Sequence, residues 1–213
     1  DIVGVSASPT SGYNSALANL GNVTNSGIEL LLRVKPVVTD DFSMELSFNY
    51  TKNDSEVVAT NDSDGNISLD QPRPMGIAVT HIVGQRMGAL FGTSFVRDSS
   101  GAIVHENSAG YPRPQIDTNR KILGFGIAPT QLGIGASFRY KDLNASFLIE
   151  GKSGGQIYSG TNMEMLGRGL HKMTIPAGGR ESGFVPDGVM TDGSPVTQSL
   201  SVVEQQNYWN RYN

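Results

Sequence analysis

The chain has 213 residues, with 26 glycines, 10 prolines, no cysteine, 17% charged residues and a net charge of −4. This glycine and proline content is typical of a turn-rich β protein. The lack of cysteine excludes disulfides and thiolate metal sites. The negative net charge and the lack of a basic cluster argue against nucleic acid as a partner. No stretch approaches the roughly 18 consecutive apolar residues of a membrane-spanning helix, whereas a mean hydropathy of −0.22 is compatible with a membrane barrel, in which only every second strand residue faces lipid.

The first two predicted strands, near 28–35 and 42–52, alternate between apolar and polar side chains. In the second strand the alternation has no exception, and in the first only Leu31 interrupts it. Because side chains of a strand project alternately to two faces, each segment is predicted to be a long strand with one apolar and one polar face. A tilted strand of about ten residues can cross the hydrocarbon layer of a bilayer, whereas strands of soluble sheets are usually about five or six residues long.

Two further strands, near 132–140 and 144–151, show the same alternation, with Leu148 as the exception. None of the four segments has apolar residues at the i, i+3, i+4 and i+7 spacing of an amphipathic helix. All four are therefore predicted to be strands.

The connections between these strands differ in length. Short segments, 36–41 and 141–143, join the strands within each pair, which predicts two antiparallel hairpins with tight turns. The segments 53–131 and 152–213 are predicted to be long loops. Short turns on one side and long extracellular loops on the other are typical of outer-membrane barrels.

We therefore expect an all-β chain in which residues 1–213 form part of a single β-barrel domain. Its first residues show neither the basic region nor the apolar region of a signal sequence. Four strands do not close a barrel, which needs about eight. The chain is expected to be a fragment of a longer protein.

Several segments carry a family pattern in a fixed order. LGNVTNSGIELL at 20–31 contains the pattern G-N-x-x-N-x-G-I-E that introduces a barrel strand, and GQRMGALFG at 84–92 follows the next strand. DTNRKILG at 117–124 and GGQIYSG at 154–160 flank the second strand pair. In this order, the segments resemble the SusC/RagA family of TonB-dependent outer-membrane transporters of Bacteroidetes.

The resemblance implies a large transmembrane barrel, 22-stranded in the family, of which this chain is a C-terminal part with long extracellular loops. It also implies localisation in the bacterial outer membrane and nutrient uptake by import of oligosaccharides or oligopeptides. The implied partners are a SusD-like surface lipoprotein, the membrane lipid and the TonB complex, which acts through parts of the transporter absent from this chain.

Two hypotheses account for the alternating strands. In a transporter wall, Glu45, Asn49, Arg139 and Glu150 line the lumen, and the lipid-facing residues are Phe42, Met44, Leu46, Phe48, Phe138, Tyr140 and Phe147. In the alternative, a secreted soluble β-rich binding or adhesion module, the same apolar residues form a core between two sheets.

Four aromatic residues in the second long loop are candidates for ligand contact: Tyr158, Tyr208, Trp209 and Tyr212. Aromatic rings stack on sugars and contact peptide side chains at a low cost in conformational entropy. The same residues are equally compatible with an interfacial aromatic girdle or with packing of the loops.

No motif predicts a metal site, a cofactor or an enzyme. His81, His105 and His171 are isolated, and NDSDGN at 61–66 lacks the register of a calcium loop and is predicted to be an Asx turn. No G-x-S-x-G nucleophile motif occurs.

Overall fold

The computed structural model of the chain describes residues 2–6, 8–13, 15–19, 21–60, 65–70, 76–179 and 181–212. These residues divide into two compact units. The first unit comprises Asp1–Asp70, Ala78–Leu90 and Gly124–Ile157, and the second comprises Gln71–Ile77, Phe91–Leu123 and Tyr158–Asn213.

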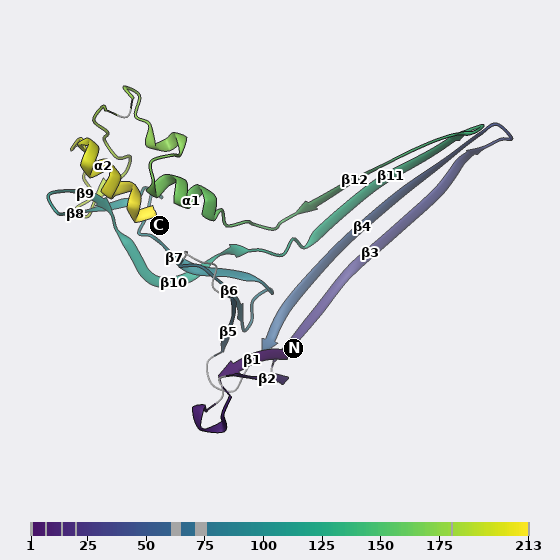
Figure 1. Ribbon diagram of the computed structural model, residues 1–213, viewed down its shortest axis with the longest axis horizontal. Helices are drawn as coiled ribbons and strands as arrows, with labels where there is room; N and C mark the ends of the chain where they lie inside the picture. Colours follow the sequence, from purple (N-terminus) through teal and green to yellow (C-terminus); the bar gives the residue numbers. More distant parts are fainter. Residues whose placement is uncertain are drawn as a thin grey trace. The chain divides into compact units, whose positions relative to one another are not determined.

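The first unit is built on a four-stranded antiparallel sheet with the order β12-β11-β4-β3 (Figure 1). Its strands are β3 (Asn22–Val38), β4 (Phe42–Ala59), β11 (Thr130–Tyr140) and β12 (Leu143–Ser153). They have 17, 18, 11 and 11 residues, so all are longer than the usual soluble strand of about five or six residues. The predicted fold class, all-β with antiparallel strands, is confirmed.

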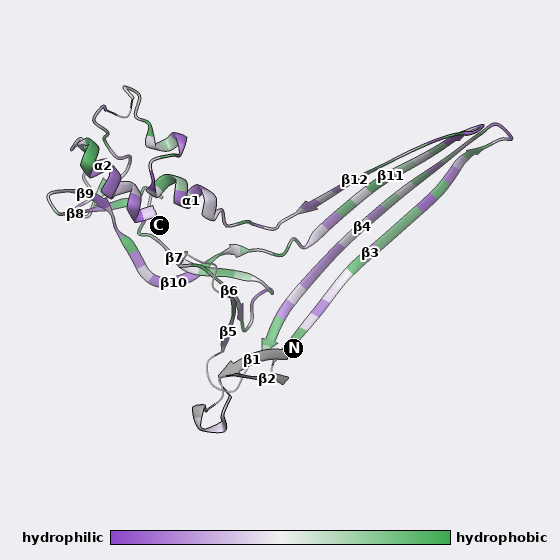
Figure 2. Ribbon diagram, in the orientation of Figure 1, coloured by the Kyte–Doolittle hydropathy of each residue, from purple (hydrophilic) through white to green (hydrophobic). Residues whose placement is uncertain are grey.

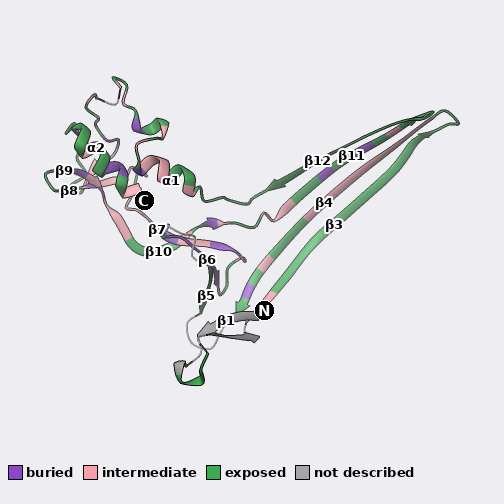
Figure 3. Cartoon of the chain, in the orientation of Figure 1, coloured by how far each residue is buried: buried purple, intermediate pink, exposed green. Residues whose placement is uncertain are grey.

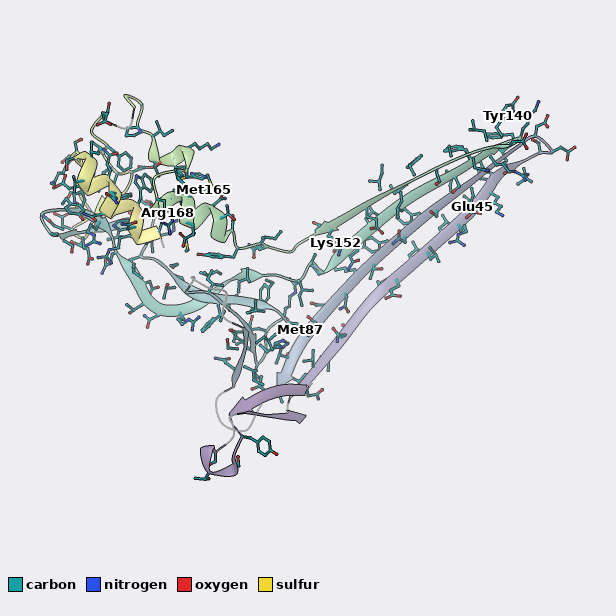
Figure 4. All side chains as sticks on the ribbon, in the orientation of Figure 1. Glu45, Met87, Tyr140, Lys152, Met165 and Arg168 are labelled. Carbon is teal, nitrogen blue, oxygen red and sulfur yellow. The ribbon has the colours of Figure 1, made fainter. Side chains whose placement is uncertain are left out.

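Short turns join the strands of each hairpin, and residues in them provide the hydrogen bonds and the backbone conformation that a tight turn needs. Thr39 closes the turn between β3 and β4: its N–H donates to the Phe42 carbonyl at 2.7 Å, and its hydroxyl accepts from the Phe42 N–H at 2.9 Å. In the turn between β11 and β12, Lys141 adopts a positive φ of 51°. Figure 4 labels Tyr140 and Glu45 near the end of the sheet that carries these turns and Lys152 farther from it along β12.

Strand β3 contains a β-bulge between Val34 and Val37. Pro36 lies inside it, and because proline has no backbone N–H, it cannot take part in the ladder of a regular strand. The bulge restores the register, so that Val37 pairs with Met44 and returns to the apolar face.

The first unit also contains shorter elements. They are β1 (Ile2–Ser6), paired with β2 (Ser15–Asn19), the 3-10 turn η1 (Pro9–Ser11), and β5 (Asn66–Asp70), paired with β6 (Ala78–Ile82).

The second unit contains a three-stranded sheet, in the order β13-β8-β9, and two helices. The strands are β8 (Val104–Ser108), β9 (Tyr111–Pro114) and β13 (Val189–Met190), the last pairing with β8 in parallel. The helices are α1 (Gly160–Gly167) and α2 (Val202–Trp209), with 3-10 turns η2 (Lys172–Thr174) and η3 (Asn210–Tyr212). Strands β7 (Ala89–Phe95) and β10 (Ile116–Phe125) are hydrogen-bonded neighbours.

The segments 53–131 and 152–213, expected as loops, therefore contain strands β5 to β10, strand β13 and helices α1 and α2. Their strands are mostly short and lack the alternation that marks β4. Helix α2 has a local signal, because the Glu204 carboxylate three residues after Ser201 accepts the Ser201 N–H at 2.7 Å, as in a capping box. None of the helices in the described part of the chain is long and apolar enough to span a membrane.

The second unit has an aromatic core. It consists of Tyr111, Leu200, Tyr208 and Trp209, with Leu166, Phe184 and Tyr212 packed against it. In the first unit, by contrast, Figure 3 shows β3 as almost entirely exposed and β4 as mostly intermediate. The long sheet thus gains little burial from the described residues.

Gly27, the last glycine of the G-N-x-x-N-x-G-I-E pattern, pairs with Asn53 where the backbones of β3 and β4 lie close together. A Cβ atom there would collide with the Lys52 carbonyl oxygen and lie 3.1 Å from the Asn53 Cα. We expect Gly27→Ala to destabilise the folded full-length protein by about 1–3 kcal/mol, since the obstacle is backbone. Urea unfolding in lipid vesicles measures the change.

Gly151→Ala is the matched control, because a Cβ atom on that β12 glycine meets no atom within 4 Å. It should be neutral or slightly stabilising. Equal loss of stability in both variants would contradict the close approach of β3 to β4.

Candidate ligand-binding site and strand faces

The register of the four-stranded sheet places all seven predicted lipid-facing residues on one face. Leu46 pairs with Ala136, which also pairs with Phe147, and Phe48 pairs with Ile134. Met44 pairs with Phe138, and Phe42 with Tyr140. Directly paired residues project to the same side of a sheet, so these apolar side chains form a single face across β4, β11 and β12.

This apolar face continues onto β3 and is exposed. Leu30 and Leu32 pair with Tyr50 and Phe48, and the two leucines are 52% and 53% exposed. Exposure at Phe147 and Ile149 is 51% and 65%. Figure 2 shows hydrophobic and hydrophilic residues interspersed along the strands, as expected when successive residues face opposite sides of the sheet.

The opposite face is polar and carries the four residues predicted to line a lumen. Asn49 pairs with Gly133, which also pairs with Glu150, and Arg139 pairs with Ser43 and Asn144. The Glu45 carboxylate forms ion pairs with Arg33 at 3.3 Å and Lys35 at 3.4 Å. These charges are partly exposed, so each pair contributes only about 0–1 kcal/mol.

Two pockets that share part of their lining are formed by residues of the second unit. The smaller pocket has a volume of about 260 Å³, and the larger pocket one of about 450 Å³. Arg97 and Tyr212 line both pockets. The smaller is otherwise bounded by residues that include Ile77, Phe95, Tyr158 and Arg211, and the larger by residues that include Met173, Phe184, Val185, Asp187, Tyr208 and Trp209.

All four aromatic residues predicted from the sequence line one or both pockets, but their burial differs. Tyr158 is 37% exposed, and its hydroxyl contacts the Met163 sulfur at 2.9 Å. Tyr208 and Trp209 are 2% and 6% exposed and belong to the core. Tyr208 and Trp209 therefore form part of the pocket walls as buried core residues, whereas more of the surface of Tyr158 is accessible to solvent or ligand.

The aromatic rings pack closely around Trp209. Its ring centroid lies 5.1 Å from that of Tyr208, 5.4 Å from that of Phe184 and 5.3 Å from that of Tyr212. Such contacts stabilise beyond simple burial. The Trp209 indole nitrogen is buried and has no hydrogen-bond partner among the described residues, so shape and apolar contact account for its position.

His105 is a buried residue that the sequence does not single out. It is fully buried, with Nδ1 3.1 Å from the Ile103 carbonyl oxygen and Nε2 3.2 Å from the Tyr208 hydroxyl. Burial lowers the pKa of His105 and raises the pKa of Tyr208, so both are neutral near pH 7. Tyr208 follows His105 by 103 positions, and no local spacing signals such a pair.

A tight turn positions Arg97. The Asp98 carboxylate accepts the N–H groups of Ser100 and Ala102 at 2.9 and 3.0 Å, and the Ser100 hydroxyl lowers the pKa of Asp98. Arg97 Nη1 donates to the Gly101 carbonyl at 2.7 Å. The guanidinium is thereby held at the rim of both pockets.

Possible metal-ligating side chains do not cluster in the described part of the chain. Within the described residues, no group of three or more His, Cys, Asp or Glu side chains lies close enough to hold a metal ion. Of the segment 61–66, only Gly65 and Asn66 belong to the described part, so the predicted Asx turn lies largely outside it.

Comparisons with known proteins find relatives of one kind. No family model matches the chain. TonB-dependent receptor P3 of Formosa agariphila is 25% identical over 182 residues, covering 77% of this chain and 18% of that protein. TonB-dependent receptor SusC of Bacteroides thetaiotaomicron is 26% identical over 152 residues, covering 66% of this chain and 15% of that protein. The chain thus spans less than a fifth of the length of these curated relatives.

The fold is similar to part of a solved transporter. The structure of the RagAB peptide transporter superposes with a TM-score of 0.54 and 14% sequence identity, covering 78% of this chain and 18% of that one. This similarity supports the architecture. The resemblance predicted from the ordered sequence segments is confirmed by the sequence relatives: the chain is similar to part of TonB-dependent receptors, SusC among them.

Proposed function

We propose that the four-stranded sheet is a segment of the barrel wall of an outer-membrane transporter. In this proposal, lipid covers the face that carries Leu46 and Phe147, and the face that carries Glu45 lines the lumen. The observation that supports it is the register, which gathers the apolar residues of four long strands on one exposed face. Strands of this length suffice to cross the hydrocarbon layer.

The same exposure disfavours the soluble alternative. A β-sandwich covers such a face with a second sheet about 10 Å away. Here Ile28, Leu30, Leu32, Phe147 and Ile149 remain at least half exposed. Exposed apolar surface of this extent calls for lipid or another partner.

The parent protein, we further propose, imports oligosaccharides or oligopeptides with energy delivered by TonB and acts with a SusD-like surface lipoprotein. The second unit belongs to its outward-facing loops, where Tyr158, Tyr208, Trp209 and Tyr212 contribute to substrate binding. The proposal assigns transport rather than catalysis to the protein, and needs no metal or cofactor.

Fractionation and growth test this function. Cells that lack the parent gene should lose growth on one class of oligomeric nutrient, tested as oligosaccharides and oligopeptides in parallel. Reintroducing the full-length gene should restore growth, and a copy without its TonB-interacting segment should not. Recovery of the folded full-length protein in the soluble fraction without detergent would contradict transport and favour a secreted binding module.

A further inference from the structure

We propose that Arg97 binds the free C-terminal carboxylate of an apolar peptide whose side chains occupy the two pockets that Arg97 lines. This inference rests on the proposed transport function and names the class of substrate. Three features of the site support the inference: the charge of Arg97, the residues that line the pockets, and the two residues, Arg97 and Tyr212, that line both.

Arg97 is a cation without a carboxylate partner among the described residues. None of the ion pairs between described side chains includes it. The neighbouring Asp98 is occupied by the backbone of its own turn, and Asp187, which lines the larger pocket, forms no ion pair with Arg97. Among the described residues, only the Gly101 carbonyl accepts a hydrogen bond from the Arg97 guanidinium, through Nη1, so the guanidinium retains donors for an incoming anion.

The second arginine of the smaller pocket already has a carboxylate partner. Arg211 Nη2 lies 3.1 Å from Glu106 Oε1. Arg211 therefore adds little attraction for an anion, and Arg97 is the anchor.

The wall of the larger pocket favours apolar side chains over sugars, and the smaller pocket combines apolar with polar residues. Met173, Phe184 and Val185 line the larger pocket. Ile77, Ile116 and Leu123 line the smaller one, together with Thr93 and Ser94. Sugar hydroxyls placed against such walls would lose hydrogen bonds to water without gaining replacements. Apolar peptide side chains instead gain from the burial of their surface.

Because the two pockets share lining residues, one cation, Arg97, can bind the carboxylate of a peptide that occupies both. Arg97 and Tyr212 line each of them, so a carboxylate at Arg97 lies beside both cavities. A peptide that ends in apolar residues places one side chain in each pocket and its terminal charge on the guanidinium. A C-terminal amide offers no negative charge there.

The experiment compares acetyl-Ala-Leu-Phe with a free carboxylate and the same peptide as a C-terminal amide. Binding to the purified full-length transporter in detergent is measured by titration calorimetry. The acid should bind at least about 10-fold more tightly than the amide, as expected for a charge-assisted hydrogen bond. Arg97→Met should remove this preference, so that the variant binds acid and amide with equal affinity.

Arg168→Met is the matched control, because Arg168 is an exposed arginine of the same unit that lines neither pocket and pairs with Glu164 at 3.0 Å. It should retain the preference. Arg97→Lys, which keeps the charge but not the planar fork, should retain part of it. Unchanged trypsin resistance of Arg97→Met shows that the fold is intact.

Equal affinity of the wild type for acid and amide would overturn the inference. So would Arg97-dependent binding of a uronic-acid trisaccharide in place of the peptide, which would assign the site to an acidic glycan. If TonB-dependent growth persists in either case, the proposed transport stands and only the peptide assignment fails. If cells that lack the parent gene grew normally on every oligomeric nutrient tested, the proposed function itself would be overturned.

Discussion

Replacing Trp209 with alanine should destabilise the second unit by about 3–5 kcal/mol, the usual range for removing a buried tryptophan. Trp209 is 6% exposed and contacts the rings of Phe184, Tyr208 and Tyr212. Its loss leaves a cavity in the middle of the aromatic core. Hydrogen exchange in the full-length protein measures the effect as faster exchange of amides in β8, β9 and α2, with the β4 amides as the internal reference.

Trp209→Phe separates packing from hydrogen bonding at this position. Phenylalanine fills much of the same volume and removes an indole N–H that has no partner among the described residues, so it should cost much less than alanine. Tyr158→Ala, at a residue 37% exposed, should affect exchange less than Trp209→Ala. If Trp209→Ala weakened peptide binding but left exchange unchanged, Trp209 would be a ligand contact rather than a core residue.

Leu46→Arg should destabilise the folded transporter by about 2–4 kcal/mol if Leu46 lies near the bilayer midplane. Leu46 pairs with Val34 on β3 and with Ala136 on β11, at the centre of the apolar face. An arginine there would place a charge in hydrocarbon. Urea unfolding of the full-length protein in lipid vesicles measures the loss, and a reduced amount of folded protein in the outer membrane should accompany it.

Thr51→Arg is the control on the same strand. Thr51 lies on the polar face and pairs with Glu29 and Gln131, so a new cation meets water and a carboxylate and should cost little. A similar loss at both positions would contradict the assignment of lipid and lumen to opposite faces.

The alternation of side chains in the sequence predicted the long hairpins well. Phe42 to Tyr50 alternates without exception, and in the structure those apolar residues share one face with their partners on β3 and β11. The reason is local, because the period of two along an extended backbone determines the face of each residue. Leu31 and Leu148, the exceptions in the pattern, lie on the polar face.

The second unit was harder to predict. Its strands are mostly short, and its core unites Tyr111 with Leu200, Tyr208 and Trp209 from a distant part of the chain. The four aromatic residues were recognised as candidates, but the sequence offered no means of separating buried Tyr208 from half-exposed Tyr158. Arg97 carries no motif, and its position beside Tyr212 depends on the folding of residues more than a hundred positions apart.

By itself, the sequence determined the class of the strands, their two faces and their tight turns, because each depends on residues close together along the chain. Only the tertiary structure decided the pairing of His105 with Tyr208 and the two pockets that share Arg97. These features arise from contacts between distant segments, and such contacts are selected by packing and burial rather than by local backbone preference.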